Sequence, residues 1–598
     1  MAALSESNTI PLGLYLWTRI KQTGISRVFG VPGDFNLTLL DHVYDVEGLE
    51  WVGNTNELNA AYAADGYART KAGAGCLVTT HGVGELSALN GVAGAMTEQV
   101  KVVHVVGQTS RKMQKNKMMI HHSIGFDPDH QMFNKASTSF RVAAAEIQDE
   151  AGATEEIDRV LRECFIKSCP VYIFLPIDLV DVQVSAKALE TPLELSPPAD
   201  QKAVESAVEA CLEAIHSSKN PAIFVDCLVQ RHQAIAELKE LVEKLQLPIY
   251  TSNMGKGIID ETHPLYVGLY NGLPTAPGVA DAWQASDLAV IIGNLPSDTN
   301  TGGFTRRMAP DKCIFINPMD VNVKSDKIYS GTPMKQVLSQ LLKQLAPEKL
   351  PKAPIPKLPE RPLEDDHDSK MITQSWVWHR LCEFLQPHDV VFGETGTAAF
   401  GLPDATFPSD ITWITQTYYG SIGYATPAAF GADIALEELA QANVRPRGRT
   451  VLVTGDGSMM LTVQEIGNMI KQNLKTLIIV INNAGYTIER VIHGARQSYN
   501  DIVPFRYEHM LQFFNMSDEK AKASFHKAGT KEELEAVLKK ESVIKPEGVT
   551  VVEIVMDMMD VPWRLSAQIG TRGPAAIKEM KDAGFRVRDM GKNEGFWN

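Results

Sequence analysis

The sequence predicts an α/β protein made of three open, doubly wound parallel-sheet domains. Short, fully apolar strand candidates alternate with helical patterns along most of the chain, which is typical of parallel sheets covered on both faces. Two breaks, TPLELSPPAD at 191–200 and the proline-rich stretch 347–362, divide this alternation into three runs. At 598 residues, the chain is also longer than one hydrophobic core normally organises.

Each run has its own predicted strands, and the first and third runs have the same layout. In the first run, helical spacing over 57–70 and 85–96 separates the strands. The predicted strands are 27–31, 75–80, 101–106 and 171–175 in the first run, 222–225, 288–292 and 313–317 in the second, and 389–392, 450–453, 476–481 and 550–555 in the third. The predicted parts are an N-terminal domain over 1–190, a middle domain over 201–346, a stiff linker over 347–367, a C-terminal domain over 368–569 and a tail over 570–598.

Composition excludes several classes of function. A formal net charge of -15 and a pI near 5.5 would repel a nucleic-acid backbone, and no basic stripe offsets that charge. The seven cysteines are scattered and never spaced CxxC, which favours a reducing compartment over a disulfide framework or a zinc site. No stretch approaches the ~20 apolar residues that span a bilayer. We therefore expect a cytoplasmic protein that binds neither nucleic acid nor membranes.

The motif GDGS at 455–458, followed by Asn482 and Asn483, is the most informative stretch of the sequence. Each half directly follows an apolar strand, and a helix predicted over 463–472 comes after the first half. Glycine allows close backbone approach, and a helix N-terminus attracts phosphate oxygens. Asp456, Asn483 and a backbone carbonyl at Gly485 are oxygen ligands of the kind that Mg²⁺ prefers. GDG alone also fits a plain turn, but the pair of motifs predicts diphosphate and Mg²⁺ binding.

This arrangement resembles the signature of thiamine diphosphate enzymes, and the whole chain is similar to the fungal-type pyruvate decarboxylase family of 2-oxo acid decarboxylases. Six motifs, spread over nearly the whole length, carry the resemblance. They are GVPGDFN from residue 30, NELNAAYAADGYAR at 56–69, HHSIG at 121–125, MGKG at 254–257, GETGTAAFG at 393–401 and NNAGYTIERVIHG at 482–494.

The resemblance implies roles for five catalytic residues. Glu57 would lie against the aminopyrimidine ring nitrogen, where a buried carboxyl promotes formation of the thiazolium ylid. Asp34, His121, His122 and Glu489 would line the reacting carbon and pass the proton that completes the aldehyde. Read alone, Glu57 and Asp34 would be ordinary residues at helix starts, the histidine pair would be a surface feature, and Glu489 would pair with a nearby arginine.

The resemblance implies that the domain over 1–190 is pyrimidine-binding and the domain over 368–569 diphosphate-binding. It also implies contacts to the cofactor and the substrate. Ile422 would hold the cofactor bent, and Thr395 to Thr397 would contact the pyrimidine. The full implied cofactor set is Gly457, Ser458, Thr395, Gly396, Thr397, Ile422, Thr487 and Ile488. The implied substrate pocket is Thr299, Tyr419 and Ile488.

Glu57 and Asp456 lie about 400 residues apart, yet both must reach one cofactor. The resemblance implies that they do so across two subunits, so we expect at least a homodimer, and a homotetramer as a dimer of dimers. The tail, with Arg572, Lys578 and Phe585, is expected to cover the site or to contact another subunit.

Some positions depart from yeast-like members of the family. Leu228 stands where an activating cysteine is expected, Gln99 replaces a histidine, and Thr299 replaces an aromatic residue. Substrate activation therefore stays an open question, as does the preference between pyruvate and branched or aromatic 2-oxo acids. Two further alternatives are a carboligase of the acetolactate synthase type and a catalytically silent structural homologue. The complete set of reactive positions favours decarboxylation of pyruvate to acetaldehyde.

Overall fold

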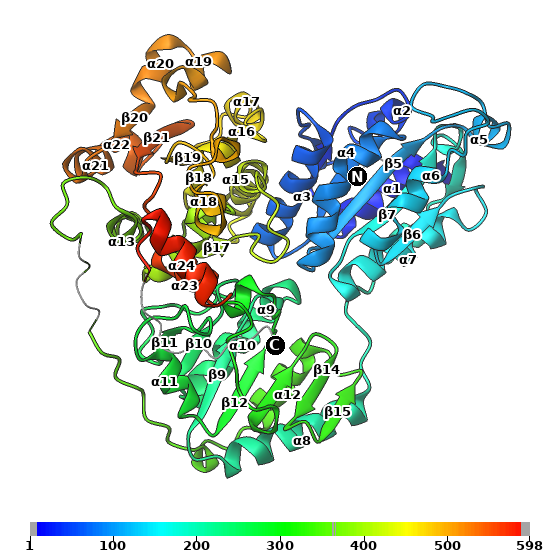
Figure 1. The fold of residues 1–598 in the computed structure, drawn as a ribbon. Helices are drawn as coiled ribbons and strands as arrows, with labels where there is room; N and C mark the ends of the chain where they lie inside the picture. Colours follow the sequence, from blue (N-terminus) through cyan, green and yellow to red (C-terminus); the bar gives the residue numbers. More distant parts are fainter. Residues whose placement is uncertain (1–8, 361–363, 365, 588–598) are drawn as a thin grey trace. The chain divides into compact units, whose positions relative to one another are not determined.

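The computed structural model describes residues 9–360, 364 and 366–587, which form two compact units. Residues up to Pro197, with Phe430–Leu436, form the first unit, and the rest of the chain forms the second. The second unit contains the middle and C-terminal domains (Figure 1). In the described part of the chain, no helix is both long enough and apolar enough to cross a membrane.

The N-terminal domain is built on a parallel sheet of strand order β3-β2-β4-β5-β7-β6. The α3 and α4 helices pack together on one face, while α1 and α7 pack together on the other. The sheet strands are β2 (Arg27–Gly30), β3 (Glu50–Trp51), β4 (Gly75–Thr80), β5 (Val102–Gln108), β6 (Ala143–Glu146) and β7 (Val171–Pro176). The helices are α1 (Leu12–Gln22), α2 (Leu37–Asp41), α3 (Glu57–Lys71), α4 (Val83–Thr97), α5 (Arg111–Lys115), α6 (Met132–Ala136) and α7 (Ala153–Lys167). A separate antiparallel ribbon joins β1 (Thr9–Pro11) to β8 (Gln183–Ser185).

The C-terminal domain repeats this topology. Its parallel sheet has the order β17-β16-β18-β19-β21-β20, which, counted along the chain, is the same order as in the N-terminal sheet. The strands are β16 (Val390–Gly393), β17 (Thr412–Ile414), β18 (Thr450–Gly455), β19 (Leu477–Asn482), β20 (Phe525–Ala528) and β21 (Thr550–Val555). The helices are α13 (Gln374–Phe384), α14 (Thr397–Gly401), α15 (Ala425–Gln441), α16 (Asp456–Met460), α17 (Glu465–Lys471), α18 (Thr487–Ile492), α19 (Met510–Phe513), α20 (Asp518–Ala523), α21 (Lys531–Leu538), α22 (Glu541–Ile544), α23 (Trp563–Gly570) and α24 (Pro574–Ala583).

The middle domain has a seven-stranded sheet of order β11-β10-β9-β12-β13-β14-β15. Its first five strands are parallel, as predicted, but β14 and β15 are antiparallel additions at one edge. The strands are β9 (Pro221–Val225), β10 (Ile249–Thr251), β11 (Tyr266–Leu269), β12 (Leu288–Ile292), β13 (Cys313–Ile316), β14 (Asp320–Val323) and β15 (Lys327–Ser330). The helices are α8 (Gln201–Ser217), α9 (Leu228–Arg231), α10 (Ile235–Leu245), α11 (Val279–Gln284) and α12 (Met334–Gln344). The prediction of three α/β domains is confirmed.

The antiparallel edge has a local cause. The connection from β13 to β14 is too short for the crossover that a parallel pair requires. Between β14 and β15, Lys324 and Ser325 both have positive φ, 53° and 55°, as in the tight turns that join hairpin strands. Such turns are normally signalled by Asn-Gly or Asp-Gly, and neither pair occurs here. The sequence therefore gave no hairpin signal at this edge.

The proline-rich linker contains no strand and only a short 3-10 helix, Pro347–Lys349, among its described residues. Leu350 and Ala353 pack against the core of the middle domain. A side chain at Gly278, just before α11, would come within 2.4 Å of Pro359. The linker thus runs along the surface of the middle domain, at least as far as Pro359.

Within the second unit, a buried ion pair ties the middle domain to the C-terminal domain. The Lys256 ammonium donates to both carboxylate oxygens of Glu261 at 2.7 Å and to the Ala405 carbonyl at 2.7 Å. It also lies 4.0 Å from the centre of the Phe407 ring. Both charged side chains are 2% exposed, so each depends on the other to compensate its burial.

Replacing Lys256 by Met is expected to lower the free energy of unfolding by about 3–5 kcal/mol, because it strands a buried carboxylate. The double substitution Lys256→Met, Glu261→Leu should recover most of that loss, since it removes both charges together. Apparent melting temperatures, compared at one scan rate, provide the measurement. A double variant no more stable than Lys256→Met would contradict this account.

Candidate active site

The two halves of the predicted diphosphate and metal motif meet at the carboxyl ends of adjacent strands. β18 leads into Asp456 and β19 leads into Asn483. The Asp456 carboxylate accepts hydrogen bonds from the backbone amides of Gly457 at 2.8 Å and Gly485 at 3.0 Å. With its amide oriented to satisfy its neighbours, Asn483 donates to the Gly485 carbonyl at 3.0 Å and accepts from the Thr487 hydroxyl at 2.9 Å. Asp456, Asn483 and Gly485 therefore form one compact group.

This group fits a hard cation beside a diphosphate. Asp456 is 2% exposed, and burial raises the pKa of its carboxyl to about 6 against the opposing effect of backbone amide donors. A nearby cation would offset the cost of burying this charge. A side chain at Gly457 would meet the Tyr486 ring at 2.7 Å, so this position is limited to glycine. Without a side chain at Gly457, the backbone at the start of α16 could lie close to phosphate oxygens.

A buried carboxyl that the sequence analysis did not single out organises the neighbouring loops. Glu394 accepts from the backbone amides of Thr395 at 2.9 Å and Ala425 at 3.0 Å. Burial raises the pKa of Glu394 to about 7. Since Ile422 lies just before Ala425, Glu394 holds two predicted cofactor segments together. The Ser458 hydroxyl donates to the Thr395 carbonyl at 3.4 Å, which connects them to the GDGS turn.

A cavity of about 470 Å³ opens beside this group. Its lining brings together Ile422 and Glu489, and α18 begins at Thr487 as predicted. Burial raises the pKa of Glu489. The full lining is Ile422, Leu461, Tyr486, Glu489, Ile492, His493, Tyr499 and Asn500.

The predicted substrate residues do not line this cavity. Thr299 is half-buried in a short 3-10 helix, Thr299–Thr301, of the middle domain. Tyr419 is half-buried, and burial raises the pKa of its hydroxyl. Ile488 packs instead into an apolar cluster with α23 and α24.

The C-terminal tail supports the helix that carries Glu489. Met580 and Phe585 share a buried cluster with Val491 of α18. His493 also contacts Glu579 of α24 at 2.6 Å. Of the residues predicted for the tail, 588–598 lie outside the described part of the chain.

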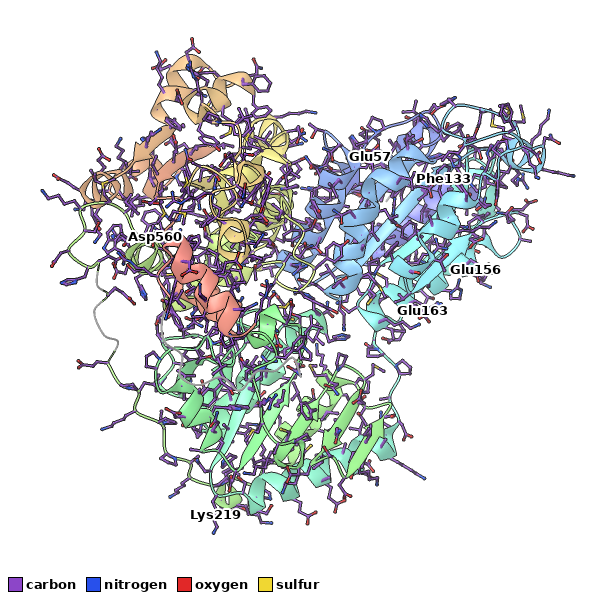
Figure 2. All side chains as sticks on the ribbon, viewed as in Figure 1. Glu57, Phe133, Glu156, Glu163, Lys219 and Asp560 are labelled. Carbon is purple, nitrogen blue, oxygen red and sulfur yellow. The ribbon has the colours of Figure 1, made fainter. Side chains whose placement is uncertain are left out.

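In the first unit, Glu57 opens α3 as predicted. Asn56 caps this helix by accepting from the Asn59 amide at 2.8 Å, which fixes where the helix starts. Glu57, labelled in Figure 2, is half-buried, so its side chain remains partly exposed to solvent. Its carboxylate lies against Gly84 in the first turn of α4, where an added Cβ would be 3.4 Å away.

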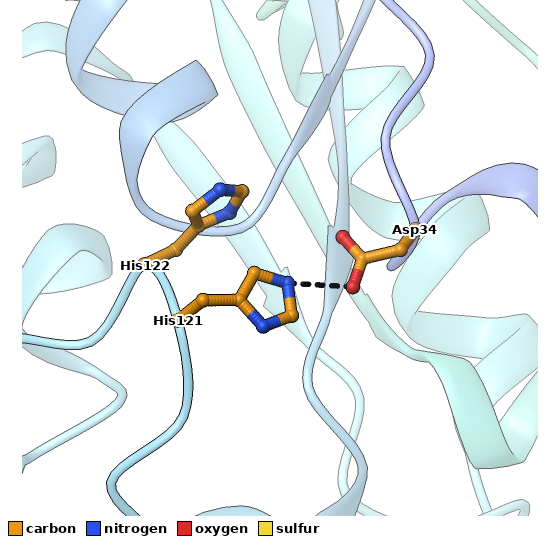
Figure 3. Close-up of side chains that lie close together, drawn as sticks. All are labelled: Asp34, His121 and His122. Atoms are coloured by element: carbon orange, nitrogen blue, oxygen red, sulfur yellow. Dashed lines mark hydrogen bonds and ion pairs between the residues drawn. The ribbon is translucent and has the colours of Figure 1, made fainter.

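Asp34 and the histidine pair come together although they are distant in sequence. His121 Nε2 lies 2.7 Å from Asp34 Oδ2 (Figure 3). One potential ligand atom from each of Asp34, His121 and His122 lies within 4.8 Å of the others. The Phe35 ring stacks on His121 at 5.2 Å between centroids, so packing helps to orient the imidazole.

The loop that carries the pair is held in a conformation that its sequence does not reveal. His122 has a φ of 68°, which is uncommon for a residue other than glycine. Its carbonyl would lie 2.7 Å from a Cβ at Gly82. Glycine at position 82 is therefore required for the loop to lie so close to the start of α4.

Behind the pair lies a buried group that the sequence analysis missed. The His81 ring stacks on His130 at 5.5 Å, and His81 Nδ1 is 3.6 Å from Glu85 Oε1. Burial, followed by neighbouring histidines, lowers the pKa of His81 to about 4, and burial raises the pKa of Glu85 to about 8. Two signals could have revealed this group: His81 follows the carboxyl end of a buried strand, and Glu85 stands at a helix-capping position.

Comparisons with known proteins match all three domains. Residues 12–132 match the N-terminal TPP binding domain of thiamine pyrophosphate enzymes, residues 208–345 their central domain and residues 393–554 their C-terminal TPP binding domain. The chain is 41% identical to a pyruvate decarboxylase of Candida glabrata over 94% of its length and 97% of the relative. It is 41% identical to pyruvate decarboxylase isozyme 1 of Saccharomyces cerevisiae, over 94% and 98%, and 40% identical to a pyruvate decarboxylase of Aspergillus terreus, over 92% and 95%.

Glu85 should make stability depend on pH. Burial raises the pKa of Glu85 from an ordinary value of 4.5 to about 8 in the folded protein, so between these values only the folded state holds the proton. Its stabilising contribution is complete below pH 4.5 and is lost as the pH rises through about 8, by about 1.4 kcal/mol per pH unit. As the pH rises from 5.5 to 8, the melting temperature of the wild-type protein should therefore fall relative to that of Glu85→Gln. Parallel melting curves for the two proteins across that range would contradict the assignment.

Proposed function

Because this chain belongs to the pyruvate decarboxylase family of thiamine diphosphate enzymes, we propose that it removes CO₂ from a small 2-oxo acid and releases the aldehyde, with pyruvate as the main substrate. The observation that carries this proposal is the Asp34–His121–His122 cluster (Figure 3). These groups can supply the proton that turns the product of CO₂ loss into an aldehyde. A carboligase benefits from withholding that proton, so the cluster argues against the acetolactate synthase type.

Thiamine diphosphate, when bound, would supply a nucleophilic carbon that adds to the 2-oxo group and a cationic ring that accepts the electron pair left when CO₂ departs. Asp456, Asn483 and the Gly485 carbonyl are proposed to hold Mg²⁺. This proposal is supported by the compact group that the three residues form at the carboxyl ends of β18 and β19. The backbone at Gly457 and Ser458, at the start of α16, is proposed to bind the diphosphate oxygens.

The remaining cofactor contacts are proposed for other loops of the C-terminal domain, near the carboxyl ends of its strands. Thr395, Gly396 and Thr397 would contact the pyrimidine through their backbone, Ile422 would set its angle, and Thr487 and Ile488 would close over the cofactor. The Glu394 hydrogen bonds support this placement, since they connect the Thr395 loop to the segment after Ile422.

The catalytic proton steps are proposed for five side chains. Glu57 would hold a proton at the pyrimidine ring nitrogen and so activate the cofactor. Asp34, His121 and His122 would pass a proton to the reacting carbon. Glu489 would assist from the cofactor side, since it lines the 470 Å³ cavity and burial raises the pKa of its carboxyl.

Substrate choice is proposed to involve Thr299, Tyr419 and Ile488. Near the substrate, the small Thr299 side chain would leave room for branched or aromatic 2-oxo acids as competing substrates. Steady-state kinetics on pyruvate, 4-methyl-2-oxopentanoate and phenylpyruvate would rank them.

The active assembly is proposed to be at least a homodimer, and a homotetramer as a dimer of dimers, with Glu57 of one subunit serving a cofactor bound at Asp456 of another. The resemblance supports this, and light scattering with and without cofactor would test it. The protein is proposed to act in the cytoplasm. All seven cysteines are free and buried in the structure, which suits a reducing compartment.

A coupled assay tests the proposed activity against its rivals. Purified protein with thiamine diphosphate, Mg²⁺ and pyruvate is expected to form acetaldehyde, followed by NADH oxidation with alcohol dehydrogenase. Acetolactate as the main product would instead indicate a carboligase. Absence of any product with all the 2-oxo acids would indicate a silent homologue.

Glu57→Gln is expected to lower kcat by about 10²–10⁴ or more while leaving cofactor binding largely intact, because the amide keeps the shape but cannot hold the proton. Steady-state turnover and calorimetric titration of thiamine diphosphate give the two measurements. The exposed Glu50→Gln serves as the matched control and should keep wild-type turnover. Near-native turnover of Glu57→Gln would show that the cofactor is activated in another way.

Asp456→Asn is expected to weaken Mg²⁺ binding by about 100-fold or more, since even losing an outer partner of a metal ligand costs 10–100-fold. Titration of Mg²⁺ in the presence of thiamine diphosphate, followed by the circular dichroism of the bound cofactor, measures the change. Asp518→Asn, in the exposed first turn of α20, is the control. Equal Mg²⁺ affinity in both variants would remove Asp456 from the metal site.

A further inference from the structure

A second cavity, separate from the one beside Glu489, lies between the middle and C-terminal domains of the second unit. Its volume is about 210 Å³. The middle domain contributes α10 and the segment 254–258 after β10. The C-terminal domain contributes residues at the amino ends of β16 and β17, among them His388 and Thr412. No residue lines both cavities.

Arg445 brings a half-buried positive charge to this cavity. Its guanidinium donates to the His388 carbonyl at 2.8 Å and to the Thr412 hydroxyl at 3.3 Å. Among the described residues, no carboxylate oxygen lies within the 4.0 Å of a salt bridge to it. Burial, and to a smaller extent Arg447, lowers the pKa of Arg445, and the attraction of the more distant Asp410 and Asp389 only partly opposes that effect. The Arg445 guanidinium is therefore partly desolvated and has no carboxylate in salt-bridge contact.

Lys239 adds a second cation from the other domain. It lies on α10, is exposed, and makes no salt bridge in the described part of the chain. The third cation, Lys256, is already neutralised by Glu261 at 2.7 Å. Asp410 is the acidic residue among those that line the cavity, and His388 is the titratable imidazole. Lys239 and Arg445 therefore outweigh Asp410 in a protein whose net charge is -15.

The position in the fold also suits a ligand. Gln230 and the segment 254–258 follow β9 and β10, so the cavity lies outside the carboxyl ends of two neighbouring parallel strands. Open α/β sheets bind ligands in crevices at this edge. Here the crevice is covered by the C-terminal domain, which contributes Arg445.

We propose that this cavity binds a small dianion, of the size of inorganic phosphate or a three-carbon dicarboxylate, between Arg445 and Lys239. A volume of 210 Å³ accommodates a few non-hydrogen atoms but not a nucleotide, since drug-sized pockets are roughly 300–1,000 Å³. The two cations come from different domains, so the ligand would join the middle domain to the C-terminal domain. Binding would add to the link that Lys256 and Glu261 already provide.

Calorimetric titration of inorganic phosphate, and separately of malonate, into the cofactor-loaded protein at constant ionic strength tests the proposal. We expect one or both dianions to bind and to raise the melting temperature, because a ligand that binds only the folded state stabilises it. Which of the two binds identifies whether the site takes phosphate or a dicarboxylate. Absence of binding by both dianions at tens of millimolar would overturn the proposal.

Variants locate the binding. Lys239→Gln, on the exposed surface, and Arg445→Gln should each weaken it about tenfold or more, as loss of a charge-assisted hydrogen bond predicts. Lys244→Gln makes the same charge change on the same helix, away from the cavity, and should bind like wild type. Unchanged affinity in Lys239→Gln would place the anion elsewhere and overturn the proposal, even if Arg445→Gln were too unstable to measure. This test is independent of the proposed decarboxylase function, because calorimetry measures anion binding and not turnover.

Discussion

The hydrogen bond from the Gly485 amide to the Asp456 carboxylate joins the two loops on which the C-terminal site depends. It can form because β18 and β19 are adjacent and parallel, so their carboxyl ends lie at one edge of the sheet. It also keeps a buried carboxylate hydrogen-bonded where apolar surroundings favour its neutral form. The loops, α16 and α18 are all placed relative to this contact.

The same constraint places the candidate site residues of both domains at the same edge of their sheets, the edge formed by the carboxyl ends of the strands. In the N-terminal sheet, Asp34, Glu57 and His81 follow β2, β3 and β4. In the C-terminal sheet, Thr395 follows β16 and Asp456 follows β18. In both sheets the reactive groups lie at the carboxyl edge, the usual location of sites in open α/β sheets. The topology fixes the place, and the loop residues decide which side chains it holds: oxygen ligands around Asp456 in one sheet, and carboxylates with histidines in the other.

Much of this could be predicted from sequence because the signals are local. A run such as TLIIVI is long enough, and apolar enough, to identify β19, and GDGS and NN follow their strands directly. The tertiary meeting of Asp34 with His121 came only from resemblance, since no spacing rule connects residues 87 positions apart.

Other features could not be predicted because their cause is tertiary. Lys324 and Ser325 adopt a turn that their side chains do not favour, so the edge hairpin was missed. Glu85 and Glu394 resembled ordinary carboxylates, and only burial makes them unusual. Thr299 and Tyr419 lie outside the Glu489 cavity, and their proposed roles are not decided by any local pattern.

The packing of α24 on α18 makes the two halves of the C-terminal site depend on different parts of the chain. Asp456 and Asn483 can settle into their hydrogen bonds once β18, β19 and their neighbours have formed. The helix that holds Glu489, however, is buttressed by Met580, Phe585 and Glu579, which come later in the chain than every strand of that sheet. Removing α24 should therefore loosen the Glu489 helix while leaving the hydrogen bonds between Asp456 and its neighbours in place.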